Sequence, residues 1–131
     1  MAWRLSQREM EALLTQHGKA RYSYFLTKTA DQEKIWSLWH DGGWALAGGD
    51  QGRQLVPVWP HEKYAEACSN GPWADYEPKA IEMEAWLARW IPGMMRDARL
   101  VAVFPTPSDK GVAVEPAQLE ADLRGKLAEY E

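Results

Sequence analysis

The chain has little cysteine, no excess of positive charge and no long apolar run. Cys68 is the one cysteine among 131 residues, which excludes an internal disulfide and a cysteine-rich zinc site. Lysine and arginine number 15 against 19 aspartate and glutamate, for a formal net charge of −4. This balance argues against nucleic acid and against an anionic membrane surface as partners. No stretch reaches the ~20 apolar residues that a membrane-spanning helix needs.

Signals for export and for catalysis are also lacking. The N-terminus, MAWRLSQREM, is too polar for a signal peptide, so together with the lone cysteine it predicts a cytoplasmic protein. None of the histidines has a histidine four residues away, and no HExxH motif occurs. The glycines between 42 and 52 form turns and no GxxxxGK[ST] phosphate loop. We therefore expect no enzyme, no catalytic residue, no metal and no cofactor.

The length predicts one domain over residues 1–131, with a helical N-terminal segment (1–30) and a sheet-containing body (31–131). Ser6-Gln7-Arg8-Glu9 matches a capping box, and apolar residues then follow at helical spacing. Gly18 is the predicted end of this first helix. A second helix is predicted over 20–30.

A change of period marks the start of the sheet. Residues 35–40 and 44–48 read as two strands joined at Asp41-Gly42-Gly43. A two-residue loop would place Trp39, Trp44 and Leu46 on one face. A three-residue loop would instead group Trp36, Leu38, Trp44 and Leu46, and we favour it because it gives one large apolar face. A third strand of the meander is predicted over 55–59, with Pro57 at an edge or a bulge.

The remaining pattern alternates between helix and strand. We predict a short helix at 61–69, a strand at 76–81, a helix at 83–91 interrupted by Pro92-Gly93, two paired strands at 99–104 and 111–115, and a last helix from Pro116. The predicted fold class is α+β, with a mostly antiparallel sheet of about five to six strands and helices packed on it.

Four blocks of the sequence resemble a known family. They are RYSYFLTKTADQEKIWSLWHDGGWALAG, PVWPHEKYAEAC, YEPKAIEMEAWLARWIPGM and LVAVFPTPSDKGVAVEP. Together they are similar to domain-of-unknown-function family 2750, a family of small bacterial proteins. The resemblance implies a compact bacterial cytosolic α+β domain and no assigned catalytic residue. A fainter similarity, at Val58-Trp59-Pro60-His61 and in the late hairpin, is to SseB-type domains, which look like interaction modules.

Tryptophan is the residue in excess, with eight against two phenylalanines. Trp86 and Trp90 lie on one helical stripe and are predicted to be core. The group Trp39, Trp59 and Trp73 serves either packing or recognition, and packing is the favoured reading. Cys68, on the apolar side of the short helix, is predicted to be a buried inert thiol.

Three functions fit these features. The first is a non-enzymatic interaction module that binds another protein or a second copy of itself through an exposed aromatic patch. The second is a small-ligand binder or weak enzyme with a pocket lined by Trp59, His61, Tyr64 and Trp73. The third is an immunity or regulatory protein whose acidic surface binds a basic toxin encoded nearby.

Overall fold

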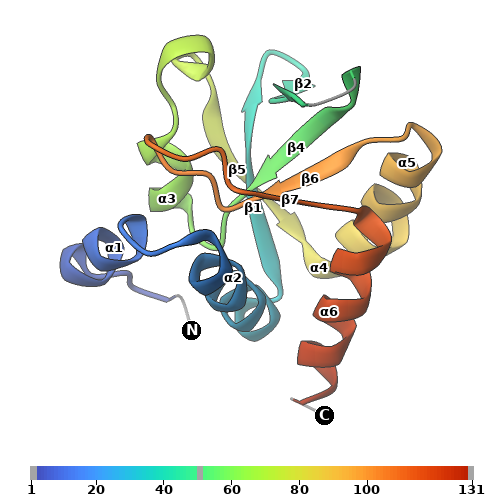
Figure 1. The fold of residues 1–131 in the computed structure, drawn as a ribbon, viewed down its shortest axis with the longest axis horizontal. Helices are drawn as coiled ribbons and strands as arrows, with labels where there is room; N and C mark the ends of the chain where they lie inside the picture. The colour runs from blue at the N-terminus through green and yellow to red at the C-terminus, as the bar shows by residue number, and fades with distance from the viewer. Residues whose placement is uncertain (1–2, 50–51, 130–131) are drawn as a thin grey trace.

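A computed structural model describes residues 3–49 and 52–129, and in this part of the chain seven strands form two sheets. The strand orders are β2-β1-β5 and β3-β4-β6-β7, and every pairing is antiparallel except that of β4 with β6. Helices surround the strands (Figure 1). The α+β class and the mostly antiparallel pairing are confirmed, although the strands divide between two sheets where one was expected.

The elements follow the chain in this order: α1 (Gln7–Leu14), α2 (Gly18–Gln32), β1 (Lys34–His40), β2 (Gly43–Trp44), β3 (Ala47–Gly48), β4 (Gln54–Val58), α3 (Glu62–Ala67), η2 (Gly71–Trp73), β5 (Glu77–Glu82), α4 (Met83–Ala85), the π-helical turn η3 (Trp86–Trp90), α5 (Ile91–Arg96), β6 (Leu100–Val103), β7 (Val112–Val114) and α6 (Pro116–Ala128).

The first two helices begin with side-chain caps. Ser6 Oγ accepts from the Glu9 backbone N–H at 3.1 Å, but the Glu9 carboxylate accepts from the Tyr24 hydroxyl at 2.6 Å, so only half of the predicted capping box forms. Gly18 does not end α1, as we expected. It is the first residue of α2, and an added Cβ there would lie 2.9 Å from Val112 Cγ2, so this glycine permits close packing on β7.

The β1–β2 hairpin has the two-residue loop, so the three-residue loop that we favoured is wrong. Trp39 pairs with Trp44 across the ladder, and Asp41 and Gly42 both have positive φ (44° and 82°). A loop with positive φ at both central residues has a twist that matches the flanking strands, and Asp-Gly tolerates it. The expected apolar face of Trp36, Leu38 and Trp44 does not form, because Trp44 lies opposite Trp39, on the other face of β1 from Leu38. Both faces of β1 are covered, since Ser37 and Leu38 are both buried.

The two sheets meet where β1 approaches the end of β4. The predicted strand 44–48 is split, since β2 pairs with β1 while β3 pairs with β4. Beyond β4, Trp36 and Trp59 exchange backbone hydrogen bonds of 2.9 and 2.8 Å, which connects β1 to the end of β4. Pro57 lies past the end of β3, so its missing N–H interrupts no bond to that strand.

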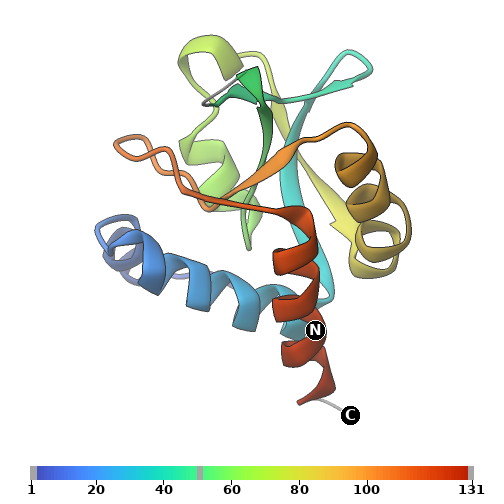
Figure 2. The same ribbon diagram turned by 45° about the vertical axis from the view of Figure 1, so that its right-hand side comes forward.

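The helix from Met83 continues to Arg96 without the predicted interruption at Pro92-Gly93. Its middle is the π-helical turn η3, where the Ile91 N–H bonds to the Trp86 carbonyl five residues back. This extra residue per turn places Pro92 in the first turn of α5, where a missing N–H costs little. Segment 83–96 is therefore one connected helical rod beside the sheets (Figure 2).

The C-terminal third matches its prediction. β6 and β7 are antiparallel partners, and α6 begins with Pro116 and buries Leu119 and Leu123. Helices α2 and α6 contact each other below the sheets in both ribbon views (Figures 1 and 2). Among the described residues, no helix is long and apolar enough to cross a membrane.

Candidate functional site

The structure divides the five predicted site residues among three places. Trp59 and Tyr64 have no exposed surface, while Trp39, His61 and Trp73 are half-buried. Trp59 lies with Trp73, and His61 and Tyr64 face the N-terminal segment. Trp39 lies on the β1–β2 hairpin with other tryptophans.

The Trp59 cluster connects α3 to the loop that follows β6. The Trp59 indole N–H donates to the Pro105 carbonyl at 2.9 Å, and Cys68 Sγ lies 3.4 Å from the same oxygen. Trp73 packs edge-on against Trp59, with ring centroids 6.2 Å apart. Burial raises the pKa of the Cys68 thiol to about 11, so the reactive thiolate is scarce at neutral pH. Trp59 and Cys68 are therefore buried with their polar atoms satisfied, while Trp73 is half-buried at the edge of the cluster.

His61 and Tyr64 contact the N-terminal segment. His61 is the N-cap of α3, where Nδ1 accepts from the Lys63 N–H at 3.1 Å and Nε2 lies 3.2 Å from the Trp3 carbonyl oxygen. The Tyr64 hydroxyl lies 2.9 Å from that of Tyr24. Burial raises the pKa of Tyr64 to about 12. Both side chains are thus engaged in local hydrogen bonds.

Trp39 begins a continuous row of indoles that runs from the β1–β2 hairpin to the helical rod 83–96. Ring centroids are 4.9 Å apart from Trp39 to Trp44, 4.8 Å from Trp44 to Trp90, and 5.5 Å from Trp90 to Trp86. The Lys79 ammonium lies 4.1 Å above the Trp39 ring and 5.7 Å from that of Trp44. The hairpin register and the π-helical turn together bring these rings into contact.

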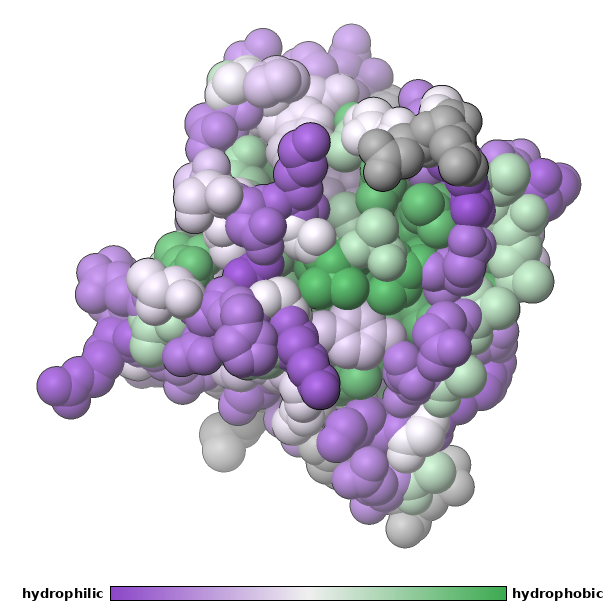
Figure 3. Space-filling model, in the orientation of Figure 1, coloured by the Kyte–Doolittle hydropathy of each residue, from purple (hydrophilic) through white to green (hydrophobic). Residues whose placement is uncertain are grey.

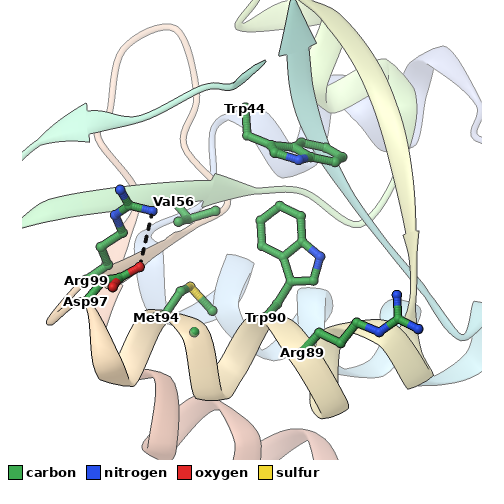
Figure 4. A pocket seen from close by; sticks show the side chains of 8 residues that line it. Trp44, Val56, Arg89, Trp90, Met94, Asp97 and Arg99 are labelled. Carbon is green, nitrogen blue, oxygen red and sulfur yellow. Dashed lines mark ion pairs between the residues drawn. The ribbon is translucent and has the colours of Figure 1, made fainter. Parts of the chain in front are cut away.

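The two middle indoles of this row, Trp44 and Trp90, border a cleft of about 320 Å³. We name it the tryptophan–arginine cleft; its lining residues are Trp44, Val56, Arg89, Trp90, Gly93, Met94, Asp97 and Arg99. Val56 and Met94, only 2 % and 4 % exposed, form its apolar base. Trp44 and Trp90 supply half-buried indoles (Figure 4). The close-up also shows Arg89 on one side of Trp90 and the pair Arg99–Asp97 on the other.

Positive charge dominates the rim of the tryptophan–arginine cleft. Asp97 is shared by Arg96 at 3.4 Å and Arg99 at 3.9 Å. Arg89 is exposed and has no ion pair within the described ranges. Two arginines line the cleft against one carboxylate, and Arg96 lies beside it through its pair with Asp97, in a chain whose net charge is −4.

Exposed apolar surface elsewhere is limited. Met95, at 54 %, is the one mainly exposed large hydrophobic side chain in the part of the chain that the structure describes. On the face drawn in Figure 3, apolar residues gather over β4 and β6 with hydrophilic residues around them. The wide exposed aromatic patch expected for an interaction module is thus reduced to the partly exposed indoles.

A second recess, of about 430 Å³, lies between the α1–α2 turn and the loop that contains Ser108. Its buried cation is Arg21, which is 2 % exposed, donates to the Phe104 carbonyl at 3.0 Å and is paired with Asp109. Because Asp109 already neutralises this guanidinium, the recess holds a completed ion pair. No motif in the sequence marked Arg21, whose partner is distant along the chain.

Comparison with known proteins places the chain in a family. Residues 22–123 match the family described as "Protein of unknown function (DUF2750)". The chain belongs to the DUF2750 family. No curated protein matches it. Every residue that lines the tryptophan–arginine cleft falls within the DUF2750 range, whereas Trp3 and Glu9, which contact His61 and Tyr24, lie before it.

Sequence reasoning did not find this cleft, because its residues come from separate segments. The prediction that Trp90 is core is only partly right, since Trp90 is half-buried, and the hairpin residue Trp44 and the strand residue Val56 carry no pattern that pairs them with it. Within residues 3–49 and 52–129, no three histidine, cysteine or acidic side chains are arranged to hold a metal ion.

Proposed function

We propose that this DUF2750 chain is a non-enzymatic protein-interaction module whose contact surface is the tryptophan–arginine cleft. The observation that carries the proposal is the meeting of two half-buried indoles, an apolar base and the unpaired Arg89 in one concave site. Tryptophan and arginine dominate the binding energy of protein interfaces, particularly where they border a pocket that excludes water.

The state of the reactive side chains supports a role without catalysis. Burial favours the protonated forms of the Cys68 thiol and the Tyr64 hydroxyl, so neither is a ready nucleophile or base near neutral pH. Both ring nitrogens of His61 lie within hydrogen-bond distance of backbone atoms. These groups stabilise α3 and its contacts, and they do not converge on the tryptophan–arginine cleft.

The volume of the cleft favours a second candidate, a binder of small planar anions. About 320 Å³ falls at the low end of the ~300–1,000 Å³ range of small-molecule sites. Trp90 would stack on the ligand and Arg89 would bind its charged group. Native mass spectrometry of the protein purified from its own host distinguishes this candidate, because a retained metabolite adds a defined mass that Trp90→Ala abolishes.

Photocrosslinking tests the interaction module directly. Gly93 lines the cleft, and an added Cβ there meets only the Arg96 guanidinium at 3.7 Å; Gly125, on α6, has open space. We replace each glycine by p-benzoylphenylalanine in host cells. A discrete protein adduct from position 93, absent from position 125 and lost when Arg89→Glu is added, is the expected result. Equal adducts at both positions, or none at 93, contradict the proposal.

We further propose that the protein is bacterial and cytoplasmic. A more specific form of the interaction role is an immunity or regulatory protein. The rim of the cleft is basic, so a basic toxin would have to bind elsewhere on the acidic remainder of the surface. Affinity purification from the native host tests this role: a basic partner encoded beside this chain supports it, and an unlinked acidic partner contradicts it.

A further inference from the structure

We infer that the segment bound in the tryptophan–arginine cleft is an acidic peptide segment that carries a single apolar or aromatic anchor between carboxylate side chains. This inference rests on the proposed interaction function and gives the partner's chemistry. It follows from the charges at the rim, from the order of groups along the cleft and from the composition of the rest of the chain.

The charges at the rim require negative groups on the partner. Arg89 has no carboxylate partner among residues 3–49 and 52–129, and Arg96 and Arg99 share Asp97. Lys79 adds a further cation beside Trp44, 5.7 Å from its ring centroid. A neutral or basic segment would leave these cations unmatched or repel them. A carboxylate instead forms a charge-assisted, bidentate pair with guanidinium, which is strengthened where an indole excludes water.

The order of groups along the cleft places the apolar side chain of the bound peptide between its carboxylate side chains. In Figure 4, Trp90 and Met94 lie in the middle, Arg89 lies toward one end, and Arg99 with Asp97 lies toward the other. An apolar side chain over Trp90, Met94 and Val56 therefore brings its neighbours along the peptide to the two arginine ends. The contribution at the Arg89 end is the larger, because Asp97 already satisfies part of the charge of Arg99.

A peptide fits better than a nucleic acid strand. Single-stranded nucleic acid also uses indoles and arginines, but it presents a phosphate at every nucleotide and needs a long positive groove. Here the positive rim extends over one cleft, and the chain as a whole carries −4, which repels an extended polyanion. A short acidic segment places its charge only where the arginines lie.

Peptide display followed by binding measurements tests the inference. Random dodecapeptides displayed on phage are selected on the wild-type chain and depleted on the Arg89→Glu/Arg99→Glu variant. We expect an enriched pattern of Asp or Glu on both sides of Trp, Phe or Leu. A synthetic peptide with this pattern is then labelled with fluorescein, and its dissociation constant is measured by anisotropy.

Matched variants test whether peptide binding depends on the arginines of the cleft or on the charge of the chain in general. Arg89→Glu is expected to weaken binding by about tenfold or more, and Arg99→Glu by less. Arg124→Glu, on α6 and paired with Glu120, is the control and should leave binding within about twofold. Raising NaCl from about 50 to about 300 mM should weaken the wild-type complex several-fold. Thermal unfolding confirms that each variant is folded.

Several outcomes would overturn the inference. They are an enriched pattern that is basic or uncharged, no enrichment, equal effects of Arg89→Glu and Arg124→Glu, or tighter binding of labelled oligothymidylate than of the acidic peptide. The failures of the two proposals are distinguishable. A specific adduct from position 93 together with a basic or uncharged peptide pattern contradicts only the acidic partner, whereas the lack of an adduct at position 93 contradicts the interaction module itself.

Discussion

Tryptophan side chains form both the Trp59 cluster and the tryptophan–arginine cleft, but their surroundings differ. Trp59 is wholly buried, and its indole N–H is bonded to the Pro105 carbonyl. Trp44 and Trp90 are only half-buried and border a concave surface with Arg89 beside them. An indole that is closed in and hydrogen-bonded stabilises the fold, while one with an open face and a cation at its edge is available to a partner.

The contrast also shows that abundance of tryptophan does not locate a site. Four of the five predicted site residues are in or near α3 and η2, where aromatic side chains fasten a short helix to the strands. The open indoles lie on the other side of the hairpin, against the helical rod 83–96. Removing one indole at a time therefore tests whether the two groups of tryptophans differ in role.

The largest expected effect is on stability in the Trp59 cluster. Trp59→Ala should lower the free energy of unfolding by about 3–5 kcal/mol, because it opens a cavity and removes the bond to Pro105. Urea denaturation followed by circular dichroism measures the loss. A loss no greater than that of Trp90→Ala would remove the distinction between the two regions.

High pH should weaken the packing of α3, which contains Tyr64 and ends at Cys68. Folding raises the pKa of Cys68 from 9.0 to about 11 and that of Tyr64 from 10.0 to about 12. The protonated forms are favoured by the fold, so this stabilisation is complete below about pH 9 and is lost as pH rises through the folded pKa values. The unfolding free energy should fall by about 1–3 kcal/mol between about pH 8 and about pH 10.5.

Two variants test whether Cys68 and Tyr64 cause the loss of stability at high pH. Cys68→Ala and Tyr64→Phe each should give a shallower decrease with pH than the wild type, whatever their stability at neutral pH. Chemical denaturation at the two pH values gives the comparison. Slopes that are unchanged in both variants would show that other groups control the alkaline loss.

The tryptophan–arginine cleft should respond in the opposite way to mutation. Trp90→Ala should lower the unfolding free energy by only about 1–2 kcal/mol, since the indole is half-buried, yet it should abolish binding of the selected acidic peptide. Arg89→Glu provides the control in which binding falls and stability is unchanged. Full binding by folded Trp90→Ala would rule out the cleft as the contact surface.

The smallest effect is expected at Trp86. Its buried indole N–H has no acceptor among the described residues, so Trp86→Phe removes an unsatisfied donor along with some packing. The two changes oppose each other, and we expect a net change within about 1 kcal/mol. Trp59→Phe, which breaks a satisfied bond, is the matched comparison and should cost more. Equal losses in urea denaturation would contradict this difference.

The local parts of the fold were predictable because they depend on neighbouring residues. The short helix after Trp59-Pro60, the pairing of β6 with β7 and the start of α6 at Pro116 all follow from period and turn chemistry. The register of the β1–β2 hairpin was not predictable in this way, because the preference for one large apolar face assumed that the other face was exposed. Ser37, on that face, is buried and donates to the Pro57 carbonyl at 2.7 Å.

The candidate site was the least predictable part because its residues come from three distant segments. Trp44 comes from β2, Val56 from β4, and Trp90 with Met94 from the helical rod. The π-helical turn shifts the phase of the stripe that contains Trp86 and Trp90, leaving the first buried and the second open. Neither this shift nor the split of strand 44–48 between two sheets has a local sequence signal.

The most direct measurement is a titration of the wild-type chain with the selected acidic peptide, followed at each indole N–H in ¹H–¹⁵N spectra. Residue-specific assignment comes from single tryptophan-to-phenylalanine variants. We predict that the signals of Trp44 and Trp90 shift on binding while those of Trp59 and Trp73 stay in place. Shifts at Trp59 and Trp73 with Trp44 and Trp90 unchanged would contradict the division of the tryptophans into a structural cluster and a binding cleft.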